Sequence, residues 1–87
     1  MQVFKIYVGN LSFKTTTDGL REHFQACGEV TDSVVITDRD TGRSRGFGFV
    51  TFETKEAMER SIAEMNNNEL DGRSLRVNQA QEKSQSN

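Results

Sequence analysis

Four short segments with the residue pattern of β-strands constrain the fold of this 87-residue chain more than any other feature. In the first, polar or aromatic residues alternate with the aliphatic residues Ile6 and Val8, the period of two that places neighbouring side chains on opposite faces of a sheet. The other three are a run of β-branched residues, a run that contains several phenylalanines, and a short apolar run near the end. The predicted strands cover residues 4–9, 30–37, 45–52 and 75–80.

Two segments between these strands have the period of helices. In the first, Leu20, Phe24 and Cys27 recur at positions i, i+4 and i+7, which is one face of a helix. Oxygen-bearing side chains at 15–18 can cap its start, and Gly28 is suited to its end. The second helix has the same pattern. Thr54 can cap its start, and the asparagines at 66–68 end it. Its apolar stripe consists of Ala57, Met58, Ile62 and Met65.

The resulting order βαββαβ is typical of the α+β ferredoxin-like sandwich, a four-stranded antiparallel sheet with two helices on one face. The turn-forming residues 38–44 and 71–72 fit its connections. Two helices cover only one face of such a sheet, so the other face stays open to solvent. We expect one domain at residues 4–80 and a polar, disordered tail at 81–87.

Strand parity predicts which side chains lie on the open face. Ile6 and Val8 suit the core, so Tyr7 and Lys5 are expected to point outward. Placing the aromatic side chains in the core instead would turn the aliphatic ones toward solvent. The function therefore depends on what the open face carries.

The third strand presents two more aromatic side chains in the same way. Val50 and Phe52 suit the core, with Gly46 and Gly48 on the same side, where the absence of a side chain lets a helix pack closely. The residues of opposite parity, which we expect on the open face, are Arg45, Phe47, Phe49 and Thr51. Phenylalanines on a solvent-facing surface have no packing role, so they indicate a binding surface.

These strands resemble the signatures of a known family. Residues 45–52, RGFGFVTF, match the eight-residue signature of the RNA recognition motif at every position, and residues 6–11, IYVGNL, are similar to its six-residue partner. The resemblance covers residues 4–80, including the interval between the two signatures. The pieces KIYVGNLSF and RSRGFGFVTF are most similar to domains of heterogeneous nuclear ribonucleoproteins and plant glycine-rich RNA-binding proteins.

The resemblance implies roles for particular residues. In such domains the aromatic residues of the two signatures stack on bases or pack between riboses, and here they are Tyr7, Phe47 and Phe49. Arg45 corresponds to the leading basic residue, which pairs with a phosphate. Related domains often touch bases from the positions of Lys5, Ile36, Arg76 and Asn78. A further candidate contact, from the edge of the 38–44 loop, is Arg43.

Single-stranded RNA is therefore the expected partner, and single-stranded DNA is the alternative nucleic acid. Every base has a π-face that can stack on an aromatic ring, whereas bases inside a duplex cannot reach such a platform. The formal net charge of −2 gives no basic footprint, so the prediction rests on local chemistry. The resemblance further implies a monomer that acts in RNA processing or post-transcriptional regulation.

A protein-interaction module on the same fold is the competing hypothesis. Relatives that bind protein have usually lost some of the aromatic residues, whereas this chain has all of them. The outer side of the second helix is a candidate protein-binding surface, with charged residues at Glu56, Glu59, Arg60 and Glu64.

Catalysis, a metal site and a cofactor find no support in the sequence. There is no nucleophile beside a base, and His23 has no second ligand at metal-binding spacing. Cys27 is the only cysteine, which excludes an internal disulfide and fits a reducing compartment. No apolar run has the length of a membrane span, and the start of the chain lacks a secretory pattern. We expect an intracellular protein of the nucleus, the cytoplasm or an organelle, without membrane association.

Overall fold

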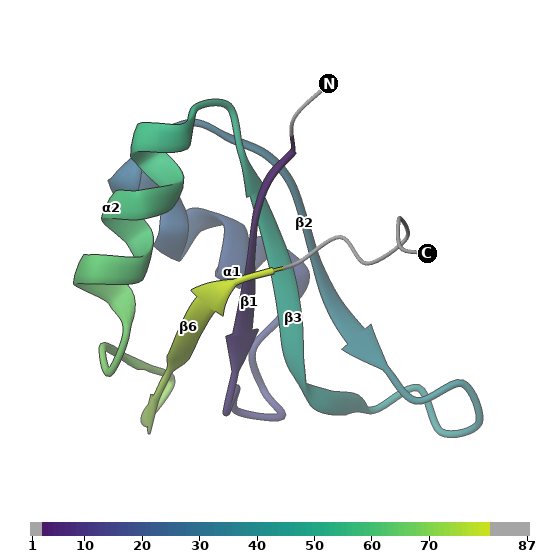
Figure 1. Cartoon of the computed structure of the whole chain (residues 1–87). Coiled ribbons are helices and arrows are strands. Elements are labelled where there is room, and N and C mark those ends of the chain that lie inside the picture. The colour runs from purple at the N-terminus through teal and green to yellow at the C-terminus, as the bar shows by residue number, and fades with distance from the viewer. Residues whose placement is uncertain (1–2, 81–87) are drawn as a thin grey trace.

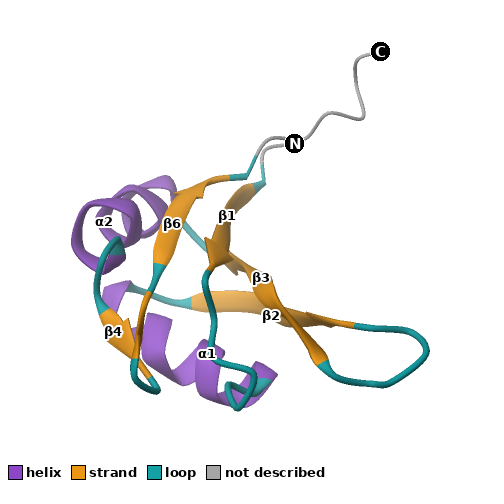
Figure 2. Cartoon of the chain, turned by 90° about the horizontal axis from the view of Figure 1, so that it is seen from below, coloured by secondary structure: helices purple, strands orange, loops and turns teal. Residues whose placement is uncertain are grey.

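The computed structural model describes residues 3–80 as two helices packed behind one sheet (Figure 1). The strands and helices follow the order β1 (Phe4–Gly9), α1 (Thr17–Phe24), β2 (Val30–Thr37), β3 (Ser44–Phe52), α2 (Lys55–Met65), β4 (Glu69–Leu70), β5 (Arg73–Ser74) and β6 (Arg76–Gln79). The main sheet has the order β2-β3-β1-β6, with every neighbouring pair antiparallel. Both helices lie on the same side of this sheet (Figure 2). The α+β ferredoxin-like fold expected from the sequence is thereby confirmed; the tail at 81–87 lies outside the described residues.

Both helices are capped by threonines: Thr54, as the sequence pattern indicated, and Thr16, one of the four candidates at 15–18. Thr16 Oγ1 accepts a hydrogen bond from the backbone N–H of Gly19 at 3.0 Å, and Thr54 Oγ1 accepts one from Ala57 at 3.1 Å. Each bond satisfies one of the N–H groups that the first turn of a helix leaves without a partner. Neither α1 nor α2, the helices of the described residues, has the length and apolarity needed to cross a bilayer.

The end of α1 and the stripe of α2 differ from the prediction. The α-helix ends at Phe24, and a 3₁₀ turn over Gln25–Cys27 carries the chain to Gly28. In α2, Ser61 is fully buried, while Ile62 is only partly buried against the core. Ser61 is tolerated inside because its hydroxyl donates to the carbonyl of Met58 at 2.7 Å.

A short hairpin of β4 and β5 precedes the last strand, where the sequence indicated only a turn. Its tip is Asp71–Gly72, with φ angles of 53° and 87°. Two consecutive positive φ angles fit the tight turn that joins antiparallel strands. The hairpin ends at Ser74, before the predicted 75–80 segment, and β6 is one residue shorter than that segment at each end.

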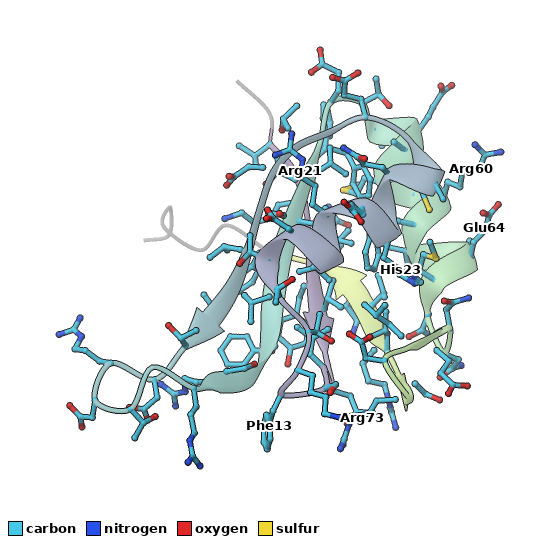
Figure 3. All side chains as sticks on the ribbon, turned by 180° about the vertical axis from the view of Figure 1, so that it is seen from behind. Phe13, Arg21, His23, Arg60, Glu64 and Arg73 are labelled. Carbon is cyan, nitrogen blue, oxygen red and sulfur yellow. The ribbon has the colours of Figure 1, made fainter. Side chains whose placement is uncertain are left out.

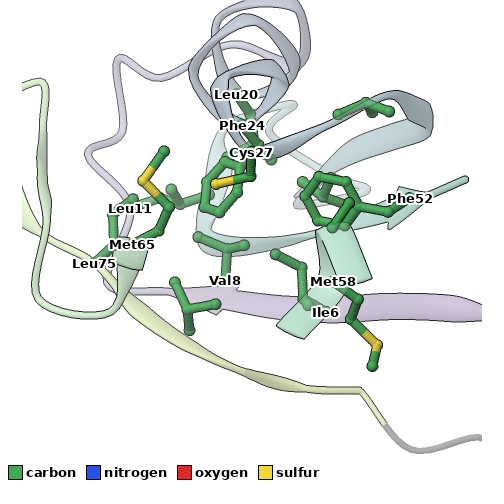
Figure 4. Close-up of a cluster of buried hydrophobic side chains, with 14 of the residues drawn as sticks. Ile6, Val8, Leu11, Leu20, Phe24, Cys27, Phe52, Met58, Met65 and Leu75 are labelled. Carbon is green, nitrogen blue, oxygen red and sulfur yellow. The ribbon is translucent and has the colours of Figure 1, made fainter. Parts of the chain in front are cut away.

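The core fills the space between the sheet and the two helices (Figure 4). Ile6, Val8 and Val50 are fully buried and Phe52 is 2% exposed, as strand parity predicted. Gly48 also faces inward: a Cβ there would lie 3.3 Å from Leu20 Cδ2 of α1 and would collide with the Val34 carbonyl. The close approach between α1 and β3 thus requires glycine at this position.

Gly46 has a different role from the one expected. Its φ of +87° is a backbone conformation that favours glycine, and a Cβ there would lie 3.8 Å from both the Leu11 carbonyl and Phe13. The pairing of β2 with β3 is irregular near this point, between Val35 and Thr37. Gly46 therefore serves the bend of β3 rather than helix packing.

Candidate nucleic-acid interface

Three aromatic rings form one cluster on the face of the sheet opposite the helices. Tyr7 comes from β1, and Phe47 and Phe49 come from β3, with Tyr7 paired to Phe49 in the ladder. The ring centroids lie 5.7 Å apart for Tyr7 and Phe47, 5.9 Å for Tyr7 and Phe49, and 6.1 Å for Phe47 and Phe49. All three side chains are half-buried, so the rings support one another and keep surface free for a ligand.

The register of the sheet extends this cluster into a row across all four long strands. Tyr7 is paired with Asn78 of β6 on one side and with Phe49 on the other, and Phe49 is paired with Val34 of β2. Val34 is 39% exposed, and sequence reasoning did not single it out. Val35 beside it is buried, and strand parity then turns both Val34 and Ile36 toward the open face. The clue in the sequence was therefore that Val34 shares its parity with Ile36, which was already a candidate contact.

Gly9 determines how the Tyr7 ring lies on the sheet. A Cβ added at Gly9 would lie 2.7 Å from the Tyr7 hydroxyl oxygen and 2.8 Å from its Cε2. The ring therefore leans along β1 and covers the Cα of Gly9. Only a residue without a side chain leaves this space for the ring.

Basic side chains lie around the aromatic cluster. Lys5 Nζ is 5.3 Å from the centroid of the Phe49 ring, within the range of a cation–π contact. Arg76 is exposed and lies opposite Gly9 in the pairing of β1 with β6. Arg45 is exposed on β3, and Arg43 is exposed just before that strand. Of the predicted site residues, Arg43 alone lies off the strands; the others share the open face or its rim.

Three hydrogen bonds made by side chains tie the β4–β5 hairpin to the chain that follows β1, and nothing in the sequence indicated them. Asn10 Nδ2 donates to the Ser74 carbonyl at 2.6 Å, and its Oδ1 accepts from Arg73 Nη2 at 2.6 Å. Thr15 Oγ1 donates to Asp71 Oδ2 at 2.7 Å across 56 residues of sequence. These bonds hold the hairpin beside the end of the aromatic face.

Phe13 is a second feature that sequence reasoning missed. Its side chain is 77% exposed, more than any other large apolar residue that the structure describes. Figure 3 shows its ring pointing away from the body of the molecule, at the same end as Arg73. The only clue in the sequence was an aromatic residue in a polar loop.

His23 and Cys27, which the sequence analysis considered for metal binding and disulfide formation, have neighbours that fit a structural role. His23 Nε2 lies 3.0 Å from Asn68 Oδ1, and burial together with the nearby Glu64 carboxylate raises the pKa of the Cys27 thiol. Within residues 3–80, no group of His, Cys, Asp and Glu is arranged to hold a metal ion. On the outer side of α2, Arg60 pairs with Glu64 at 3.3 Å, so these charges are matched within the helix (Figure 3).

The fold and the cluster define a class: a single α+β domain whose sheet presents aromatic and basic side chains to solvent. The family model described as RNA recognition motif matches residues 6–76. The chain belongs to the RNA recognition motif family.

Curated relatives and solved structures agree with this assignment. The chain is 57% identical over 76 residues to glycine-rich RNA-binding protein 1 of Mycosarcoma maydis, covering 87% of this chain and 43% of that protein. It is 53% identical over 78 residues to the glycine-rich RNA-binding, abscisic acid-inducible protein of Zea mays, covering 90% and 50%. The chain thus spans about half the length of these relatives.

Two solved structures illustrate the likeness in three dimensions. RNA binding protein PG1 has a TM-score of 0.86 at 47% identity, over 90% of this chain and 94% of that one. The Sxl-lethal protein in its complex with RNA has a TM-score of 0.86 at 26% identity, over 93% and 48%.

Proposed function

We propose that this domain binds single-stranded RNA on the open face of its sheet, by stacking bases on Tyr7, Phe47 and Phe49. The observation that carries the proposal is the ring cluster itself: three contacting aromatic side chains, half-exposed, on the face that the helices leave uncovered. The names of the relatives, glycine-rich RNA-binding proteins, support the same function.

The side chains around the rings have complementary chemistry. The Arg45 guanidinium is suited to a charge-assisted hydrogen bond with a phosphate. Lys5 and Asn78 flank the rings on either side, where they can donate to base edges. Further contacts at the rim of the face come from Ile36, Arg43 and Arg76.

Single strands fit this surface better than duplexes. Stacking needs the flat face of a base, which base pairing and neighbouring stacks cover in a duplex. Each stacked base contributes roughly 1–3 kcal/mol, so three rings supply roughly 3–9 kcal/mol before the cost of ordering the strand. We expect a dissociation constant of about micromolar order, which corresponds to a binding free energy of about 8 kcal/mol. Affinity of this order suits a role in RNA processing or post-transcriptional regulation, in which complexes form and dissociate.

A comparison of strandedness tests the proposal. Labelled RNA octamers of randomised sequence, titrated by fluorescence anisotropy, should bind at micromolar protein concentrations. A stable RNA hairpin without a free single strand should bind far more weakly. A DNA pool of the same length measures what the ribose hydroxyls contribute. No binding of any single-stranded pool at hundreds of micromolar would exclude RNA binding by this face.

A further inference from the structure

Phe13 lies outside the ring cluster, and its exposure is maintained by an ordered backbone. The Leu11 N–H donates to the Gly46 carbonyl at 2.8 Å, and the Thr15 N–H donates to the Ser12 carbonyl at 3.0 Å. Leu11 and Thr15 are both buried, so the loop is fixed on either side of the exposed ring. The ring is thus presented to solvent by a fixed turn, which reduces the ordering cost of binding to it.

The ring borders a hollow of about 370 Å³ beside the start of β3. The hollow is lined by Phe13, Asp38, Thr41, Arg43, Ser44 and Arg45. Asp38 Oδ1 accepts hydrogen bonds from the backbone N–H groups of Asp40 and Thr41, so this carboxylate is engaged by its own loop. Within residues 3–80, neither Arg43 nor Arg45 forms an ion pair. An aromatic face beside two such guanidinium groups suits a nucleobase and the phosphate next to it.

The hollow adjoins the start of β3, the strand that carries Phe47. Gly46 precedes Phe47 in β3 and lies close to the Phe13 ring: a Cβ at Gly46 would be 3.8 Å from Phe13 Cε1. Arg45, two residues before Phe47 in β3, also lines the hollow. A strand stacked on Phe47 therefore meets Arg45 and then Phe13 as it passes the end of the sheet.

We infer that Phe13 is a fourth stacking position, which takes a nucleobase of the RNA strand after it leaves the sheet. Arg43 and Arg45 hold the phosphate that links this base to the one on Phe47. The inference rests on the proposed RNA-binding function and extends it, because it lengthens the site beyond the bases that the sheet can stack.

A series of RNA lengths tests this position. Randomised single-stranded pools of three to eight nucleotides would be titrated against wild type, Phe13→Ala, Phe13→Leu and the control Val3→Ala. Val3 is also an exposed apolar residue, 50% exposed, but lies outside the hollow. Phe13→Ala should weaken binding of the longest pools by roughly 5- to 150-fold, the effect of one stacked base, and leave the shortest pools unchanged. Phe13→Leu should behave like Phe13→Ala, because leucine keeps the apolar surface but has no π-face.

A fluorescent reporter gives an independent readout. The chain contains no tryptophan, so Phe13→Trp introduces a single indole. Its emission should be quenched by the long pools and not by the shortest ones. Equal affinities of Phe13→Ala and wild type at every length, or a loss that is the same at every length, would overturn the inference while leaving the sheet function intact. Failure of wild type to bind any pool would instead overturn the proposed function, and this inference with it.

Discussion

Tyr7 and Phe49 face each other across the ladder between β1 and β3, and their rings meet edge to face with centroids 5.9 Å apart. Three residues after Phe49, on the other side of the same strand, Phe52 is 2% exposed in the core. One strand thus supplies both the proposed binding surface and the hydrophobic interior. Substitutions along β3 should therefore separate RNA affinity from fold stability.

Phe47→Ala and Phe49→Ala should each weaken RNA binding by roughly 1–3 kcal/mol, the contribution of one stacked base. Their cost in unfolding free energy should be small, about 0.5–1.5 kcal/mol, because only ring contacts on the surface are lost. Phe52→Ala should lower the free energy of unfolding by roughly 3–5 kcal/mol, because it leaves a cavity in the core. Urea unfolding and RNA titration of the three variants measure both quantities.

Two results would contradict this assignment of faces. If Phe47→Ala unfolds the domain as severely as Phe52→Ala, then Phe47 belongs to the core. If both surface variants remain folded and bind RNA like wild type, the sheet is not the binding surface. The outer side of α2 would then be the next surface to examine for a partner.

Gly9→Ala should weaken RNA binding through Tyr7. The new Cβ would lie 2.7 Å from the Tyr7 hydroxyl oxygen, so the ring must leave its place on the sheet. The obstructing atoms belong to the end of a side chain, so the fold should tolerate the change. The loss of affinity should reach up to roughly the 1–3 kcal/mol of one stacked base. In a Tyr7→Ala background the same glycine substitution should have little effect, and additive losses in this double-mutant cycle would show that Gly9 acts independently of the ring.

Local patterns in the sequence were sufficient for the sheet and the ring cluster. Parity placed Ile6 and Val8 inward and Tyr7 outward, and the bounds of β1 and β2 match the predicted segments. These features depend on neighbouring residues, because side chains alternate between the faces of any strand. The cap at Thr54, and a cap within 15–18 that the structure places at Thr16, were readable for the same reason.

Features that depend on distant partners were not readable. The bond between Thr15 and Asp71 joins residues 56 positions apart, and no local pattern marks either of them as a partner of the other. The exposure of Phe13 follows from the path of a loop that is fixed by β3, which the composition of the loop does not reveal.

Gly48→Ala should destabilise the fold more than Gly42→Ala. A Cβ at Gly48 would collide with the backbone carbonyl of Val34 and lie 3.1 Å from Val35 Cα, so β2 and β3 would have to separate. We expect a loss of unfolding free energy at or above roughly 3 kcal/mol, the upper part of the range for overpacking. Gly42 has open space around it and a φ of +77°, so alanine there should cost only about 1–2 kcal/mol of backbone strain. Comparable urea midpoints for the two variants would argue against the tight approach at Gly48.

The salt dependence of RNA binding should be shallow and should depend on Arg45. The chain has a net charge of −2, and the strands that carry or flank the rings hold three cations, Lys5, Arg45 and Arg76. With about 0.7 counterions released per phosphate neutralised, three contacts predict a log–log salt slope of about −2.

Arg45→Ala should reduce the magnitude of the slope by about 0.7. Arg60→Ala removes the same charge from α2, where Arg60 pairs with Glu64, and should leave the slope unchanged. Titrations over a range of salt concentrations measure these slopes. Equal effects of the two substitutions would mean that overall charge, rather than a phosphate contact at Arg45, controls binding, and a wild-type slope steeper than about −5 would require a basic surface beyond the open face.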